Sequence, residues 1–229
     1  MASSDGSIVC ANHFETPILR NDPRNTNYVI EATSVSRAAR LTELMQPTNG
    51  VVSVTRAVGL LRDRNLPGGF FAGNGHRAAL NAFIATHATV MDLTDGIFWA
   101  SSPPHQLGKF VAFDVNDFDR ELPALTIGAD KTLASGEFEK ACEARKHLAD
   151  GERALKRKEA QSALTLAERA EALNPGFYQN AALRGRALRA LGRHPEAAKA
   201  FEAALGEHPA FLAEKRQLED WLKSVQETK

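Results

Sequence analysis

The sequence predicts an α+β protein in which a mixed α and β region is followed by an all-helical region. Up to Ala134, Pro, Gly, Asn and β-branched residues interrupt the chain at short intervals. Beyond Gly136, Ala, Leu, Glu, Lys and Arg dominate almost without interruption. The first composition favours short strands and helices joined by turns, and the second favours consecutive helices. We therefore expect two domains, residues 1–134 and 137–229.

The front domain opens with expected elements of modest length. Ser7–Cys10 reads as a short strand, and Pro17–Asn27 reads as a loop because Asp-Pro at its centre is typical of turns. The Thr and Ser residues at the start of Thr33–Met45 predict a capped helix that ends before Pro47–Gly50. Apolar residues at helical spacing predict a second helix over Ser53–Arg64.

Three strands are expected further along the front domain, and they pair most simply as an antiparallel meander. Their ranges are about Ala82–Asp92, Ile97–Ser101 and Lys109–Asp114. Asp95-Gly96 lies between the first two, and this dipeptide is a strong hairpin signal.

The composition excludes several classes of function. The chain has 28 basic and 28 acidic residues, so its formal net charge is zero and it has no bulk electrostatic attraction to nucleic acid or anionic membranes. No apolar run approaches the roughly 18 residues of a membrane-spanning helix, and the polar start lacks the apolar core of a secretory signal. We expect a cytoplasmic protein that binds neither nucleic acid nor membrane, unless the chain is a piece of an exported parent.

No cofactor or metal is expected. Cys10 and Cys142 lie far apart in the sequence and form no Cys-x-x-Cys pair, so neither a disulfide framework nor a zinc site is indicated. The histidines of the front domain also lack metal-ligand spacing; these are His13, His76, His87 and His105.

The helical region repeats with a period of 34 residues, in frames 144–177 and 178–211. Equivalent positions carry the same residue type in the pairs Pro175 and Pro209, Gly151 and Gly185, Ala163 and Ala197, and Ala170 and Ala204. This pattern resembles the tetratricopeptide repeat, in which small residues of two helices face each other and a proline closes each unit.

The resemblance implies a concave helical surface for a peptide or protein partner, with Leu212–Gln226 as a capping helix. The aromatic residue expected at Ala167 is missing, although Phe201 occupies the equivalent position of the second frame. This difference suggests looser packing of the first repeat, or packing against the front domain. A plain stack of helical hairpins without repeat ancestry is the alternative interpretation.

Three groups of short motifs in the front domain occur in a recognisable order. They are Val9–Phe14, Ser34–Arg40, and the set formed by Leu60–Arg64, Thr86–Asp92 and Gly96–Ser101. Together they resemble the rear portion of the penicillin acyltransferase-like and choloylglycine hydrolase-like enzymes, which are N-terminal-nucleophile (Ntn) amide hydrolases. The resemblance implies that residues 1–134 form part of a four-layer αββα sandwich.

The same resemblance implies a chemistry. In such enzymes a cysteine freed by self-cleavage uses its own α-amine as base and forms a thioester with the acyl group of a linear amide. Water or an amine then accepts the acyl group, and an oxyanion hole stabilises the tetrahedral intermediate.

Two residues match supporting positions of the family's site. Asn12 matches an asparagine that supports the oxyanion, and Arg37 matches an arginine lining the site near the nucleophile. The alternatives are that Asn12 is a hydrogen-bonded turn residue and that Arg37 forms a salt bridge on a helix surface.

The chain departs from the family at the nucleophile. The catalytic cysteine normally lies well upstream of the asparagine, and only eleven residues precede Asn12 here. Cys10 does not match the nucleophile's place, and we interpret it as a small buried residue on a strand.

Two hypotheses of function follow. The first is an incomplete acyltransferase or amide hydrolase, inactive alone, whose nucleophile is supplied by a missing upstream segment. The second is a non-catalytic, protein-binding repeat module fused to a degenerate hydrolase remnant.

Overall fold

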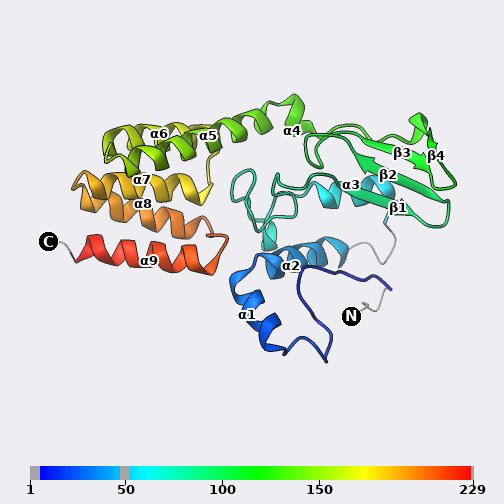
Figure 1. Ribbon diagram of the computed structural model, residues 1–229, viewed down its shortest axis with the longest axis horizontal. Helices are drawn as coiled ribbons and strands as arrows, with labels where there is room; N and C mark the ends of the chain where they lie inside the picture. The colour runs from blue at the N-terminus through cyan, green and yellow to red at the C-terminus, as the bar shows by residue number, and fades with distance from the viewer. Residues whose placement is uncertain (1–5, 47–51, 228–229) are drawn as a thin grey trace. The chain divides into compact units, whose positions relative to one another are not determined.

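The computed structural model describes residues 6–46 and 52–227, and its helices and antiparallel sheet make it an α+β protein (Figure 1). The expected helix break at Pro47–Gly50 lies outside the described residues. The chain divides into two compact units. The first contains the residues up to Asn25, Ser34–Phe70 and Gly75–Glu137, and the second contains Thr26–Thr33, Phe71–Asn74 and Phe138–Lys229.

Helices α2 (Ser34–Met45) and α3 (Val54–Leu61) lie within the two expected helical ranges. Ser53 caps α3, because its hydroxyl accepts a hydrogen bond from the Arg56 amide at 3.2 Å.

The expectation of a loop over the whole of Pro17–Asn27 was wrong, because helix α1 spans Pro23–Glu31. The Asp22 carboxylate accepts a hydrogen bond from the Arg24 amide at 2.8 Å, as a residue that caps a helix does. Pro23 occupies the first helical position, where its missing N–H costs nothing. The Asp-Pro pair therefore starts a helix here and does not form an isolated turn.

The sheet is the expected antiparallel meander with one further strand. Its order is β1 (Thr89–Asp92), β2 (Ile97–Ser101), β3 (Phe110–Asp114) and β4 (Asp117–Glu121). Strand β1 is shorter than expected, and β4 was not expected because its acidic residues lack apolar alternation. Ser7–Cys10 is not a strand, and within this segment Ile8 alone makes an isolated β-bridge.

One face of the sheet and helix α3 share a small core. Val58 of α3 is buried with Trp99, Phe110 and Ala112, which lie on β2 and β3. Arg62, directly after α3, donates hydrogen bonds to the carbonyl oxygens of Gln106, Gly108 and Gly128 at 2.7–3.0 Å. The guanidinium thus fastens the loop before β3 and the segment after β4 to the end of the helix.

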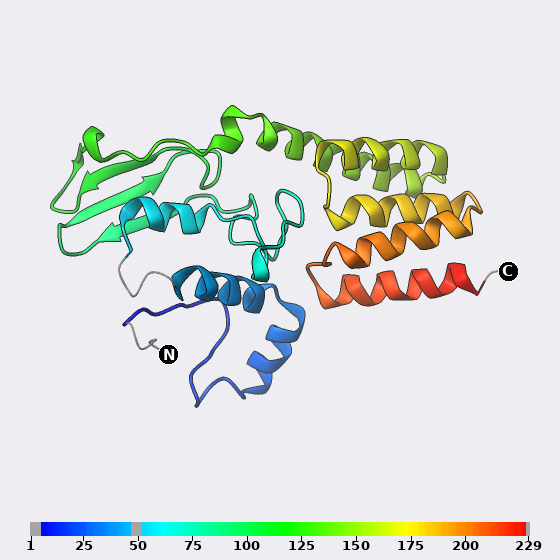
Figure 2. The same cartoon turned by 180° about the vertical axis from the view of Figure 1, so that it is seen from behind.

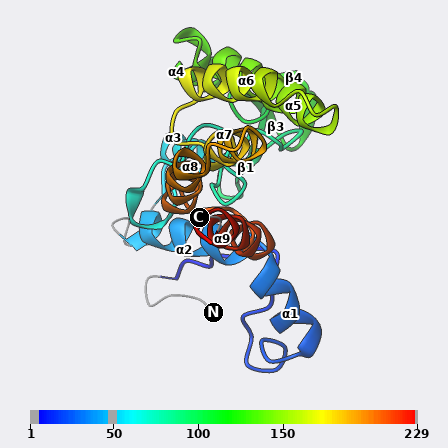
Figure 3. The same cartoon turned by 90° about the vertical axis from the view of Figure 1, so that its left-hand side faces the viewer.

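The second unit is built from successive helices that stack in chain order, as Figure 2 shows from behind and Figure 3 shows end-on. They are α5 (Glu137–Lys156), α6 (Ala160–Leu173), α7 (Tyr178–Ala190), α8 (His194–Gly206) and α9 (Leu212–Gln226), and α5 follows the short helix α4 (Lys131–Ala134). The alanines at the repeated positions are completely buried, in the pairs Ala163 and Ala197, and Ala170 and Ala204.

The 34-residue period is also present in the backbone of the turns. Lys158 and Gly192 occupy equivalent positions, and both have positive φ, at 63° and 75°. The next amide in each turn bonds back into the preceding helix at 2.9 Å, from Glu159 to Ala154 and from Arg193 to Leu188. Both helices therefore end with the same left-handed C-cap, for which glycine is the favoured residue.

Glycine allows the closest approach within the second repeat. A Cβ atom added at Gly185 would lie 2.5 Å from Cε1 of the fully buried Phe201 ring. In the first repeat, a leucine side chain and not an aromatic ring lies against the equivalent glycine. Its equivalent Gly151 faces the Leu183 side chain, which packs in one buried cluster with Ala167.

We predict that Gly185→Ala lowers the free energy of unfolding, because the new methyl group displaces a buried ring. Overpacking costs about 1–3 kcal/mol, which exceeds the gain of up to about 1 kcal/mol from better helix propensity. Gly206→Ala, at a helical glycine with open space around it, is the matched control and should be neutral or stabilising. Urea unfolding of the three proteins measures the difference, and equal stability of the two variants would contradict this packing argument.

Candidate functional site

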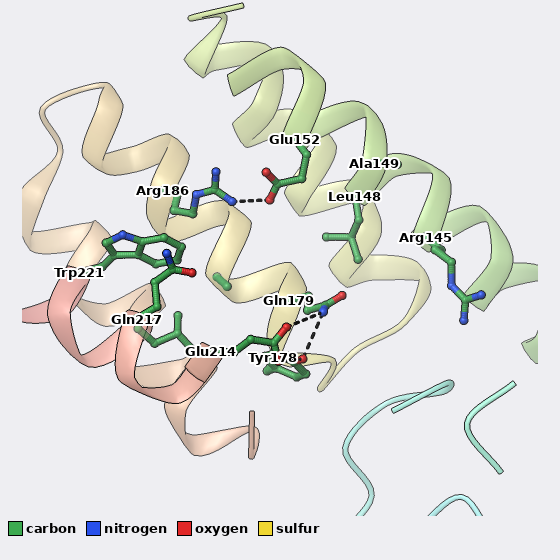
Figure 4. Close-up of a pocket in the computed structure, with 12 residues that line it drawn as sticks. Arg145, Leu148, Ala149, Glu152, Tyr178, Gln179, Arg186, Glu214, Gln217 and Trp221 are labelled. Atoms are coloured by element: carbon green, nitrogen blue, oxygen red, sulfur yellow. Dashed lines mark hydrogen bonds and ion pairs between the residues drawn. The ribbon is translucent and has the colours of Figure 1, made fainter. Parts of the chain in front are cut away.

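A hollow of about 370 Å³ lies on the face formed by α5, α7 and α9, and we call it the groove (Figure 4). Its lining comes from the first helix of each repeat frame and from α9. The residues are Arg145, Leu148, Ala149, Glu152, Tyr178, Gln179, Ala182, Arg186, Glu214, Gln217, Leu218 and Trp221.

The floor of the groove is apolar, and small side chains create its depth. Ala149 on α5 and Ala182 on α7 have short side chains. Leu148 on α5 and Leu218 on α9 are almost fully buried. An apolar side chain of a ligand would therefore replace water over a surface that offers water no hydrogen bonds.

One rim carries a hydrogen-bonded group centred on Tyr178. Its hydroxyl donates to the Glu214 carboxylate at 2.6 Å, and the Gln179 amide donates to the Tyr178 oxygen at 3.2 Å. Burial raises the pKa of the Tyr178 phenol, and the neighbouring Glu214 carboxylate raises it further, because both disfavour a phenolate.

The opposite part of the rim carries an ion pair and an aromatic ring. Glu152 and Arg186 pair directly between α5 and α7 (Figure 4). The Arg186 and Arg189 guanidinium carbons lie 5.1 and 5.6 Å from the centroid of the Trp221 ring, at the distance of cation–π contacts. These contacts hold Trp221 in a defined position at the edge of the groove.

Two polar side chains of the groove are left for a ligand. Arg145 and Gln217 are exposed, and neither side chain makes a hydrogen bond or ion pair with a residue in the described part of the chain. The groove therefore combines an apolar floor and one ion pair with an exposed cation at Arg145, a carboxylate at Glu214 that accepts the Tyr178 hydrogen bond, and an available amide at Gln217.

The structure also brings Asn12 and Arg37 together. An Arg37 Nη2 hydrogen donates to the Asn12 Oδ1 atom at 2.8 Å, across 25 residues of sequence. The amide Nδ2 of Asn12 is the end of this side chain that carries donors, as an oxyanion contact requires. The hydrogen bond is compatible with the roles expected for both residues and does not test them.

A hydrogen-bonded array that the sequence did not reveal lies beside this pair. His13 bridges Ser34, whose Oγ lies 2.7 Å from Nδ1, and Glu15, whose Oε1 lies 3.1 Å from Nε2. The order of groups resembles that of a catalytic triad, but Ser34 is 0% exposed and its hydroxyl cannot reach a substrate. The array instead holds residues 12–15 against the start of α2.

The interpretation of Cys10 as a buried residue on a strand was wrong. Cys10 is exposed and lies outside any strand, while Cys142 is partly buried. No polar contact of the Cys10 thiol orients it as a nucleophile among the residues that the structure describes. Cys10 therefore gains no catalytic role from the structure.

Comparisons with models of known protein families, with characterised proteins and with solved structures give no match to this chain. Within residues 6–46 and 52–227, no group of three His, Cys, Asp or Glu side chains is placed to hold a metal ion. In the same residues, no helix combines the length and the apolar character needed to cross a bilayer.

We predict that Tyr178→Phe reduces the loss of stability at alkaline pH. A raised folded-state pKa contributes stability that is complete below the unfolded value near 10 and is lost as the pH rises further. The variant lacks this term, so its free energy of unfolding falls less steeply above about pH 10. At pH 7 it should lose about 1 kcal/mol with the hydrogen bond to Glu214.

Tyr28→Phe is the matched control, because Tyr28 is an exposed tyrosine. Its stability should follow the wild-type curve when denaturant unfolding is repeated between pH 8 and 11. Parallel curves for wild type and Tyr178→Phe would show that Tyr178 does not titrate with folding.

Proposed function

We propose that residues 137–229 form a tetratricopeptide-like module that binds a peptide segment of a partner protein in the groove. The observation that carries this proposal is the position of the groove. It lies on the first helices of successive 34-residue units, where a concave ligand surface of stacked helical repeats is expected. Repeated buried alanines and repeated C-caps support the assignment of the helices to one type of unit.

The chemistry of the groove supports a peptide as ligand. A peptide segment carries main-chain donors and acceptors, and the Gln217 amide offers one partner of each kind. The floor around Ala149 and Ala182 accepts an apolar side chain. The lining of α5 runs from Arg145 to Glu152, which is about 10 Å along the helix and matches roughly three residues of extended chain.

We predict that Ala149→Trp weakens peptide binding at least tenfold, because the indole would fill the hollow. The full-length chain is screened against an array of peptides, and affinities for the strongest binders are then measured by fluorescence anisotropy. Ala213→Trp, at an exposed alanine of α9 outside the groove, is the control and should bind as wild type does. Equal effects of the two substitutions would place peptide binding somewhere else on the molecule.

A second candidate function rests on the hydrogen bond between Asn12 and Arg37. We infer that the front residues are the rear part of an Ntn acyltransferase or linear amide hydrolase, with the cysteine nucleophile supplied from outside this chain. Apolar side chains close to the pair in the sequence support a covering segment, because Ile8, Phe14 and Val35 are exposed to the extent of 66, 57 and 46%. In such an enzyme Asn12 would stabilise the oxyanion, and Arg37 would orient the Asn12 amide.

The alternative is that these residues are a degenerate remnant beside a functional binding module. The coding sequence adjacent to this chain distinguishes the two. A segment with a cysteine that self-cleavage exposes would support the enzyme, and its absence would support the remnant.

We predict that the purified chain alone hydrolyses no acyl amide and keeps an intact N-terminus. Without an N-terminal cysteine there is no α-amine beside a thiol to act as its base. Mass spectrometry of the protein and chromatography of a panel of acyl amides check both points. A chain that begins at Cys10, or a thiol-dependent amidase that Asn12→Ala abolishes, would contradict the proposed division of the site.

A further inference from the structure

The connection between α8 and α9 departs from the repeat at two neighbouring residues. Glu207 and His208 lie 34 residues after Leu173 and Asn174, which are found at the end of α6. Leu173 packs against an apolar cluster, whereas Glu207 places a carboxylate at the equivalent position. Asn174 has a φ of −139°, and His208 has a left-handed φ of 57°. The connection to α9 is therefore not a copy of the connection to α7.

The Glu207 carboxylate is held in a place that disfavours its charge. Its Oε2 atom is buried and accepts no hydrogen bond from any residue that the structure describes. Glu207 is the C-cap of α8, at the negative end of the helix dipole. Among the described residues, the charged groups that act on it are Glu171 of α6 and Arg184 of α7. Arg184 is already paired with Glu171 at 3.1 Å, so Glu207 has no cation to itself.

These surroundings change the protonation of Glu207. Burial raises the pKa of its carboxyl above the usual 4.5, and the Glu171 carboxylate raises it further, while Arg184 opposes both effects. The folded arrangement therefore favours the protonated carboxyl. The stability that protonation contributes is complete below the unfolded pKa of 4.5 and is lost as the pH rises through the folded pKa. Acidification from neutral pH should thus tighten the structure around Glu207.

His208 adds strain to the same connection. A residue with a Cβ atom is unfavourable in the left-handed region, and the surrounding structure must hold it there. Helix α9 follows directly and supplies Glu214 and Trp221 to the groove. Proteins open locally where their structure is least stable, at a lower free energy than global unfolding requires. A strained connection that also buries an unpaired carboxylate is such a place, and its opening would free α9 from the stack.

We propose that the α8–α9 connection, residues 207–211, is a pH-sensitive hinge that holds α9 more firmly when Glu207 is protonated. At neutral pH the ionised carboxylate gains hydration when the connection opens, so α9 separates from the stack more often. Protonation removes this gain, and the side of the groove that α9 supplies stays in place. The hinge acts in this way whatever ligand the groove takes.

Hydrogen exchange of the full-length chain, followed by mass spectrometry, measures the opening of α9. Wild type and Glu207→Gln are compared with each other at pH 7.5 and again at pH 4.5, so that the intrinsic exchange rate of the amides cancels at each pH. We expect the amides of α9 to exchange at least about threefold more slowly in Glu207→Gln at pH 7.5, because the variant has no charge to hydrate. At pH 4.5 the two proteins should exchange at nearly the same rate.

Glu202→Gln, at an exposed glutamate of α8, is the matched control and should exchange as wild type does at both pH values. Glu207→Leu, which restores the residue type of the first frame, should also slow the exchange of α9 at pH 7.5. Equal exchange of wild type and Glu207→Gln at pH 7.5, or a difference that persists unchanged at pH 4.5, overturns the hinge. A slowing that is equal in α6 and α9 overturns it as well, because the substitution would then stabilise the whole stack and not one connection.

Discussion

Contact between helices through a residue without a side chain is the constraint on which the helical unit depends. The Phe201 ring lies so close to Gly185 that no room is left for a Cβ atom. The Leu183 side chain leaves no room for a Cβ atom at Gly151. Each pair of helices can then bury its alanines completely, and the next pair stacks on it. A helical pair of this kind has no closed core of its own, so the stacking of neighbours creates the core.

The groove is a consequence of this stacking. Because successive units repeat with small displacements, their first helices present equivalent positions in a row on one face. Glu152 and Arg186 illustrate the geometry, since they occupy the same position of adjacent units and form an ion pair across them. Tyr178 and Glu214 continue the contacts to α9, so that the helix closing the stack also completes the groove.

The front unit depends on a different principle, in which polar side chains hold irregular segments in place. Arg62 binds three carbonyl oxygens of loops that contain no regular structure. Asn25 does the same for the N-terminal segment, donating to the Phe14 carbonyl and accepting from the Phe14 amide. The positions of Asn12 and His13 relative to α2 follow from this anchoring, because a segment without a ladder of its own needs side-chain partners.

The sequence by itself determined the elements whose signals are local. The 34-residue period and the helix-forming composition predicted the helices of the second unit, and α9 begins and ends at the expected residues. The Asp95-Gly96 turn predicted the hairpin of β1 and β2. Local signals failed at Pro23, where the same dipeptide suits a turn and a helix start, and at β4, an edge strand whose acidic residues hide the alternation.

Only the tertiary structure decided which side chains share a site. Arg145, Gln179 and Gln217 belong to three helices and match no motif, because a groove requires only that their faces meet. Asn12 and Arg37 were identified as candidates from short motifs, whereas their hydrogen bond and the burial of Ser34 depend on contacts between distant residues. Periodicity and turn chemistry act between neighbours in the chain. The charge balance of the groove depends on distances in space, which the chain order does not contain.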